Sequence, residues 1–111
     1  MKYMLLIYEN DAERVEKMDE RMPTCSAYAE AMVKAGIYVA GDRLRGAGAA
    51  TSVRVVEGRT HVVDGPYAEA KEQLGGYHII DVPDLDTALA WAARCPSASR
   101  GSVEVRPLWP L

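Results

Sequence analysis

Residues 2 to 8 read "KYMLLIY", and this short stretch decides how the domain has to be built. In an extended strand, successive side chains point to opposite faces of the sheet. The two faces of this strand carry, respectively, Tyr3, Leu5 and Ile7, and Met4, Leu6 and Tyr8. Because both faces are apolar, the strand needs an apolar cover on each side of its sheet.

The next segments of the chain switch from strand to helix periodicity. Residues 11 to 22 carry many charges with apolar residues at helical spacing, which predicts a short, mostly solvated helix or helical loop. The clearer helix after it is expected to be capped by Thr24 and to end at Gly36. The stretch "IYVAG", residues 37 to 41, then predicts a second strand.

The middle of the chain predicts a loop, a β-hairpin and a further strand. The glycines and alanines of residues 43 to 50 indicate a mobile loop. Alternating valines on both sides of a turn at Glu57 and Gly58 are typical of a hairpin. The stretch "GYHIIDV", residues 76 to 82, predicts the third strand of the main sheet.

The last part of the chain predicts a helix capped by Asp84 and stopped by Pro96, and then a strand at residues 102 to 106. With the hairpin set aside, the element order is that of a ferredoxin-like α+β domain, βαββαβ with an antiparallel sheet. Two helices cover only one face of such a sheet. We therefore expect a second copy of the chain to cover the other face in a homodimer. The alternative is a monomer whose hairpin folds over the open face.

The composition narrows the class of protein further. A chain of 111 residues, 49% of them hydrophobic and 26% charged, suits a single globular domain over residues 1 to 111. The net charge is -3 and the basic residues are scattered among acids, so no nucleic acid partner is expected. No apolar run is long enough to span a membrane, and the first ten residues do not form a secretion signal. Cys25 and Cys95 lack C-x-x-C spacing, which favours reduced core thiols and a cytoplasmic location.

An acid, a glycine and a proline stand together where a strand ends, in "VVDGPYAEAKEQLGG", residues 62 to 76. In a structural interpretation, Asp64 accepts backbone N–H groups of the turn, Gly65 supplies an unusual dihedral and Pro66 fixes the exit direction. In a functional interpretation, the Asp64 carboxylate has restricted hydration beside the ring of Tyr67 and acts as a general acid or base. The two interpretations are compatible, and both stay open.

Three further residues in this region are candidates for ligand contacts. Tyr67 offers an aromatic ring, and Lys71 offers a cation to an anionic ligand, although such a charge-rich segment is more often simply solvated. Tyr77 presents its ring on one face of the third core strand. Residues 67 to 73 are expected to be irregular, because their composition favours a helix whereas the flanking strands leave little room.

His78 lies in a predicted central strand, so its ring falls on a buried or half-buried face. A lone histidine at such a position is more often a hydrogen-bonded core residue than a ligand. With two histidines and no spaced acidic cluster, the sequence predicts no zinc site, and nothing marks a haem pocket, so no metal and no cofactor are expected. Trp109, between prolines in the tail, is expected to pack on the partner copy.

Three stretches of the chain resemble the DGPF branch of the YCII-related family: "MKYMLLIY", "VVDGPYAEAKEQLGGYHIIDVPDLDTALAWAARCP" and "GSVEVRPL". The resemblance covers almost the whole chain and implies a dimeric α+β barrel of ferredoxin-like subunits. Two positions depart from the usual motif, since Tyr67 stands in place of a phenylalanine and Ala70 in place of a common threonine. The wider group has a proposed catalytic His-Asp pair, but "PTCSAY" offers no histidine. Only Asp64 matches that pair, so the His-Asp mechanism is not carried over.

Two classes of function remain open. One is a cofactor-independent enzyme that acts on a small polar or aromatic molecule beside the sheet, with Asp64 as acid or base. The other is a noncatalytic dimer that binds a metabolite or a protein, and the resemblance implies a link to alternative sigma factors. The titration of Asp64 separates them, because a desolvated carboxylate titrates above its ordinary pKa of about 3.9 and one held by turn amides below it.

Overall fold

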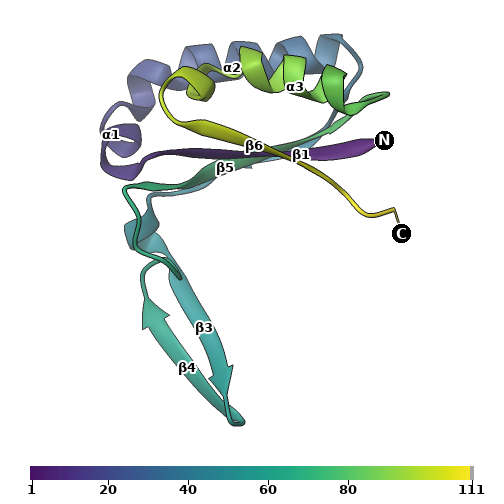
Figure 1. Ribbon diagram of the computed structural model, residues 1–111. Helices are drawn as coiled ribbons and strands as arrows, with labels where there is room; N and C mark the ends of the chain where they lie inside the picture. Colours follow the sequence, from purple (N-terminus) through teal and green to yellow (C-terminus); the bar gives the residue numbers. More distant parts are fainter. Residues whose placement is uncertain (111) are drawn as a thin grey trace.

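Within residues 1–110, which the computed structural model describes, four strands form the main antiparallel sheet (Figure 1). They span Lys2–Asn10 (β1), Tyr38–Arg43 (β2), Glu72–Asp81 (β5) and Ser102–Pro107 (β6). Their order is β2-β5-β1-β6, with β1 and β5 in the middle. This is the strand order of a ferredoxin-like α+β domain, so the predicted fold is confirmed.

Two long helices lie side by side on one face of the sheet (Figure 1). α2 spans Met18–Lys34 and α3 spans Leu85–Arg94, while the short α1, Asp11–Glu16, leads from β1 into α2. A 3-10 helix, η2, follows α3 at Pro96–Ser99. The core lies between these helices and the sheet. Its buried members are Tyr3, Leu5, Ile7, Tyr28, Met32, Ile80, Val82, Ala88, Ala92 and Cys95.

The helix α2 begins earlier than its sequence predicts. It starts at Met18 and passes through Pro23, so Thr24 lies inside the helix and is not its cap. Proline lacks the N–H group that would bond to the carbonyl four residues before it. The turn ahead of the proline is held instead by the guanidinium of Arg21, which pairs with Glu9 on β1 at 3.3 Å and with Glu13 on α1 at 2.8 Å. The predicted cap is wrong because these ion pairs join segments that the local pattern treats separately.

Two other predicted helix boundaries are confirmed. Gly36 has a φ of 74°, and its N–H group donates to the carbonyl of Val33 at 3.0 Å, which ends α2. Asp84 accepts a hydrogen bond of 2.8 Å from the N–H group of Thr87 and so caps α3. Both boundaries depend on contacts within one turn of the chain, and such contacts are visible in the sequence.

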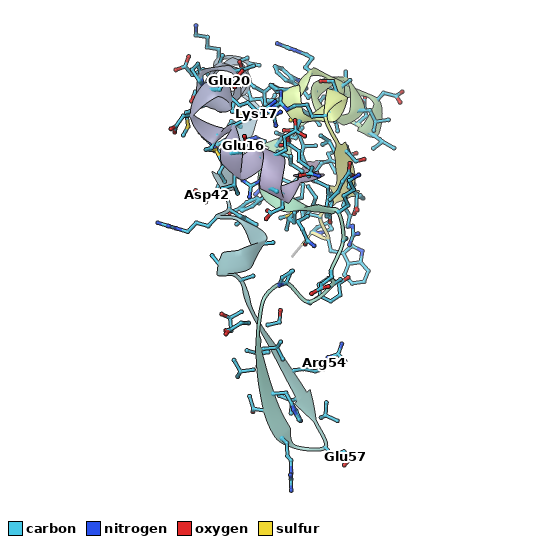
Figure 2. All side chains as sticks on the ribbon, turned by 90° about the vertical axis from the view of Figure 1, so that its left-hand side faces the viewer. Glu16, Lys17, Glu20, Asp42, Arg54 and Glu57 are labelled. Atoms are coloured by element: carbon cyan, nitrogen blue, oxygen red, sulfur yellow. The ribbon has the colours of Figure 1, made fainter. Side chains whose placement is uncertain are left out.

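The predicted hairpin forms a separate two-stranded ribbon, which we call the arm (residues 51–64). β3 spans Thr51–Val56 and β4 spans Arg59–Asp64. The turn between them has positive φ values at Glu57 and Gly58, 50° and 77°, as a type I′ turn requires. The arm projects from the end of the sheet on the side away from the helices, and Glu57 stands at its tip (Figures 1 and 2). It does not fold over the open face of its own sheet.

The sheet face opposite the helices is apolar and has no cover within the described chain. Buried and half-buried residues alternate along β1, and the half-buried Met4 and Leu6 point away from the helices. Their antiparallel neighbours on β5 are Ile79 and Tyr77, which share this face. We call these four side chains the open face. The second apolar face of β1 is therefore confirmed, and the homodimer that it suggests stays a prediction.

Candidate functional site

A cavity of about 240 Å³ lies between the sheet and the helices α1 and α2. Sites for drug-sized ligands commonly measure roughly 300–1,000 Å³, so this cavity suits a smaller molecule. Both central strands, β2, the two helices and η2 contribute to its wall. The polar residues that line the cavity are Glu9, Arg14, Arg21, Cys25, Tyr28, Tyr38, Asp42, Arg43, His78, Cys95, Ser97 and Arg100.

His78 lies on β5 opposite Leu5 of β1, on the sheet face that the helices cover. The rings of Tyr28 and Tyr38 flank the imidazole, with ring centroids 5.7 and 6.2 Å away. Gly41 on β2 leaves room for the imidazole, since a Cβ atom there would lie 2.5 Å from Nδ1. Nδ1 is buried and has no hydrogen-bond partner among the described residues.

The missing partner changes the interpretation of His78. Its position favours a hydrogen-bonded core histidine, yet the buried Nδ1 makes no such bond. Burial, and to a smaller extent the positive charge of Arg43, hold the pKa of His78 below its ordinary value of 6.5. The imidazole is therefore neutral at neutral pH and able to accept a proton. A neutral histidine without a structural hydrogen bond in a cavity wall is a candidate functional group.

Arg14 on α1 is the second unusual group of the cavity, because its long cationic side chain is only 5% exposed. Its guanidinium donates to the carbonyls of Leu44 at 3.0 Å and Arg45 at 3.3 Å, and it lies 3.7 Å from the Asp11 carboxylate. It crosses β5 at Gly75, where a Cβ atom would lie 2.6 Å from Nε. Nε itself has no partner in residues 1–110. Arg14 thus places a positive charge in the cavity wall.

The same contacts anchor the loop that leads into the arm. This loop contains a 3-10 helix, η1, at Ala47–Ala49. The N–H group of Ala47 donates to both carboxylate oxygens of Asp11, at 3.1 and 3.0 Å. The glycines and alanines of residues 43 to 50 predict a mobile loop. The partners of this loop on α1 are distant in the chain, so the local pattern does not show them. In the folded domain, Asp11 and Arg14 tie this loop to α1.

Glu9 is a buried carboxylate with several hydrogen-bond partners. Its Oε1 atom accepts hydrogen bonds from Arg21 at 3.3 Å and from Arg100 at 3.2 Å, and its Oε2 atom accepts one of 2.8 Å from the Ser97 hydroxyl. Arg21 also donates to Glu13, and this ion pair lowers the pKa of Glu13. Because their charges are matched within the fold, Glu9, Arg21 and Arg100 are structural members of the wall.

The charges around the cavity do not balance. Four arginines and two acidic residues line it, although the whole chain carries a net charge of -3. One of these acidic residues, Asp42, directs its carboxylate to Tyr77 on the open face. Arg43 pairs with no carboxylate in residues 1–110, and its guanidinium contacts the sulfur of Met22. Arg14 has the Asp11 carboxylate beside it, so Arg43 is the arginine of the wall whose positive charge no carboxylate of the described residues pairs with. Such a site suits an anion, and guanidinium groups are the side chains best shaped to bind carboxylate or phosphate.

The predicted site residue Asp64 lies outside this cavity, exposed at the end of β4. Its side chain makes no hydrogen bond to the described residues. The turn is held by the backbone, where Gly65 donates from its N–H group to Ala50 at 2.7 Å and accepts at its carbonyl from the Ser52 hydroxyl at 2.8 Å. Gly65 has the predicted unusual dihedral, with a φ of 108°. The acid or base role of Asp64 stays a prediction.

The three predicted ligand contacts do not come together with His78. Tyr67 is 89% exposed and lines a groove at the base of the arm with Tyr8. Lys71 is exposed in the segment between β4 and β5. Residues 67 to 71 are irregular as predicted, but the prediction is wrong for Glu72 and Gln73, which pair with β1 as the start of β5. Tyr77 lies on the open face, where its hydroxyl donates to Asp42 at 3.3 Å and the charge of Asp42 raises the pKa of Tyr77. None of these three residues lines the cavity of His78.

Arg14 and Arg43 are site residues that the sequence did not predict. One signal was available, in the two adjacent glycines at the start of the third core strand. A glycine within a strand often marks the close approach of another group. Gly75 gives that space to Arg14, and Gly76 approaches the carbonyl of Asp42, where a Cβ atom would lie 2.8 Å away.

Both cysteines line the cavity and are unpaired, as the sequence predicts. Cys95 is buried, and burial raises the pKa of its thiol. Cys25 is only partly buried. A raised pKa leaves Cys95 protonated, so this thiol acts as a small apolar side chain of the wall.

The donor set of the cavity favours anions over cations. No group of three or more His, Cys, Asp or Glu side chains in residues 1–110 is placed to hold a metal ion. The arginine side chains that dominate the wall are hydrogen-bond donors only. In the same range, no helix is both long and apolar enough to cross a membrane.

The strand order and the two covering helices define a ferredoxin-like α+β domain with a cavity between the helices and the sheet. The family model of the YCII-related domain matches residues 1–111, and the chain belongs to this family. An uncharacterized protein of Rhizobium meliloti (strain 1021) is 41% identical over 114 aligned residues, which cover 97% of this chain and 92% of the relative. The DGPF branch, suggested by the motif that starts at Asp64, stays a prediction.

Proposed function

We propose that this protein binds a small organic anion in the cavity between the sheet and the helices α1 and α2. The observation that carries this proposal is the buried, unpartnered Nδ1 atom of His78 in a cavity wall where arginines outnumber carboxylates. A purely structural histidine would be hydrogen-bonded, and a purely structural ion-pair network would be balanced. Arg43 is the cation best placed to meet the ligand, because it is exposed and pairs with no carboxylate in the described chain.

The same cavity supports proton transfer without a cofactor. Burial and Arg43 lower the pKa of His78, so its imidazole is neutral at neutral pH. A neutral imidazole can accept a proton from a bound acid. A bound anion offsets the charge of Arg43 and favours the protonated imidazole. Binding is therefore expected to tighten as the pH falls from neutral through 6.5, the ordinary pKa of histidine. The proposed activity is acid or base catalysis on a small carboxylate, with His78 as the proton acceptor.

A noncatalytic sensor is the second candidate, and the contacts of Arg14 favour it. Arg14 lines the cavity and also donates to Leu44 and Arg45, at the start of the loop that leads into the arm. A ligand that draws the Arg14 guanidinium toward itself would loosen this loop. The unpaired cysteines fit a reducing compartment such as the cytoplasm for either activity.

Thermal unfolding in the presence of small anions tests the proposal. Acetate, malonate, benzoate, phosphate and sulfate are the probes, and at least one is expected to raise the unfolding midpoint in a saturable manner. Arg43→Gln is expected to reduce the shift strongly. Arg45→Gln is the matched control, because Arg45 is also exposed but lies outside the cavity.

His78→Gln separates proton-linked binding from simple charge attraction. Sulfate keeps its charge near neutral pH, so any pH dependence of its binding reports on the protein. The wild type is expected to bind sulfate more tightly at lower pH, and His78→Gln is expected to lose this dependence. Equal shifts for Arg43→Gln and Arg45→Gln, or no saturable shift with any of the five anions, would contradict the proposal.

A further inference from the structure

Two free thiols lie in the wall of the cavity, although they are far apart in the sequence. Cys25 belongs to α2, and Cys95 directly follows the last residue of α3. Both residues line the cavity between the sheet and the helices. Cys25 is partly exposed, whereas Cys95 is buried. The wall therefore holds one thiol that a small reactant can reach and a second thiol that the fold shields.

The helices that carry these thiols run beside each other in opposite directions. α2 returns from the end of β1 by way of α1, and α3 returns from the end of β5. Because β1 and β5 are antiparallel, the two helices are antiparallel as well. Figure 1 shows them side by side on the sheet. A step toward the N-terminus of α2 therefore stays level with a step toward the C-terminus of α3.

A hydrogen bond between the helices fixes which of their residues are level. The hydroxyl of Tyr28 on α2 donates to the backbone carbonyl of Trp91 on α3 at 2.6 Å. Cys25 lies about one helical turn before Tyr28, on the same face of α2. Cys95 lies about one turn after Trp91. The two cysteines are therefore neighbours across the boundary between the helices, at the side that faces the cavity.

We propose that Cys25 and Cys95 form a redox-active pair that a hydroperoxide converts into a disulfide. The Cys25 sulfur attacks one peroxide oxygen, the O–O bond breaks, and the thiol proton leaves with the alcohol or water. Cys25 is now a sulfenic acid. The Cys95 sulfur then attacks the Cys25 sulfur, an S–S bond forms, and the hydroxyl leaves as water with the Cys95 proton. Two thiols have lost two electrons, and the hydroperoxide has gained them.

The surroundings of Cys95 suit the second of these steps. Burial raises the pKa of Cys95, and the nearby Cys25 raises it further. The thiol therefore stays protonated and unreactive until its neighbour is oxidised. Hydrogen bonds from Ser97 act in the opposite direction on this pKa, and they stabilise the sulfur as it attacks. Transient disulfides of this kind are compatible with a reducing compartment, where other thiols reverse them.

The disulfide is expected to weaken anion binding, because it ties α2 to the end of α3 across the cavity that also contains His78 and Arg43. This consequence rests on the proposed function, whereas the formation of the disulfide does not.

Intact mass after oxidation tests the pair in the wild-type chain. The reduced protein is exposed to excess hydrogen peroxide, unfolded and treated with iodoacetamide. The expected product has lost two hydrogen atoms, carries no alkyl group and releases a linked Cys25–Cys95 peptide on proteolysis. A product with both thiols alkylated, with a sulfinic acid at Cys25, or with links only between chains overturns the proposal.

Three variants test the order of the steps and the geometry. Cys95→Ser is expected to stop at the Cys25 sulfenic acid, which dimedone traps, whereas Cys25→Ser leaves only the buried thiol and is expected to lose this trapping. Thr24→Cys/Cys25→Ser is the matched control, because it moves the thiol to the adjacent exposed position. Its yield of intramolecular disulfide is expected to be at least about tenfold lower than that of the wild type. Equal yields overturn the proposed pairing.

Anion binding is then measured on the reduced and the oxidised protein. A disulfide that leaves the anion response unchanged overturns its link to the cavity. Reduced protein without any anion response overturns the proposed function alone, since the mass measurement decides the cysteine pair independently.

Discussion

The strand pairs β1–β5 and β3–β4 are both antiparallel and both rich in apolar residues, yet they lie in opposite surroundings. Leu5 of β1 is completely buried between the sheet and the helices. Val53 and Val62 of the arm are 64% and 63% exposed to solvent. The hydrogen-bonded ladder alone does not make a strand pair stable, because a buried apolar face supplies most of the free energy. The covered face of β1 is therefore buried within one chain, whereas the apolar side chains of the arm are not.

The largest effect on stability is expected from truncating Leu5, at the centre of the sheet face that the helices cover. Leu5→Ala is expected to lower the free energy of unfolding by about 2–5 kcal/mol, since it leaves a cavity in a packed core. Leu6→Ala changes the adjacent residue, which points to the open face. Its loss is expected to be smaller in the monomer and to grow with protein concentration. Denaturant unfolding at several protein concentrations measures both variants, and equal, concentration-independent losses would contradict the difference between the two faces.

The next largest effect on stability is expected at Gly41, which leaves room for the imidazole of His78 in the cavity wall. A Cβ atom at Gly41 would lie 2.5 Å from His78 Nδ1 and 2.8 Å from the carbonyl oxygen of Tyr77. Gly41→Ala is expected to cost about 1–3 kcal/mol of unfolding free energy and to displace His78. Gly48→Ala is the control, because a Cβ atom there meets no atom within 4 Å. If both variants unfolded at the same denaturant concentration, the tight packing around His78 would be refuted.

A smaller effect is expected from the titration of His78. Its pKa is lowered in the folded state by burial and by Arg43, so the unfolded chain binds a proton more readily than the folded one. Stability is therefore expected to fall as the pH drops below 6.5 and to recover above it. His78→Gln is expected to reduce this slope, whereas His61→Gln, in the exposed arm, is expected to preserve it. Thermal unfolding between pH 5 and pH 8 measures the slopes, and an unchanged slope in His78→Gln would count against a buried neutral imidazole.

The smallest effect is expected at the base of the arm. The Asp64 side chain is exposed and makes no hydrogen bond within residues 1–110, so Asp64→Asn and Asp64→Ala are each expected to change the unfolding free energy by less than about 0.5 kcal/mol. A loss of about 1–2 kcal/mol in the alanine variant alone would restore the turn-holding role. If either variant abolished the anion response, the acid or base role of Asp64 would be restored instead.

Several features of the fold could be predicted because each depends on neighbours in the sequence. The hairpin turn at Glu57 and Gly58, the helix end at Gly36 and the cap at Asp84 all depend on residues within a few positions. The alternation of Leu5 and Leu6 defines the two faces of β1 in the same way. The start of α2 could not be predicted, because the ion pairs of Arg21 join it to other elements.

By itself, the sequence determined the ferredoxin-like order of elements, the existence of the arm and the membership of the YCII-related family. These features follow from the spacing of apolar residues, the residue types in the turns and the family motif, which are local properties of the chain. Only the tertiary structure decided that Arg14, Arg43 and His78 share a cavity while Asp64 lies apart from it. Their proximity arises from strand pairing and helix packing between distant segments, and no local pattern encodes which distant side chains meet or which buried nitrogen is left without a partner.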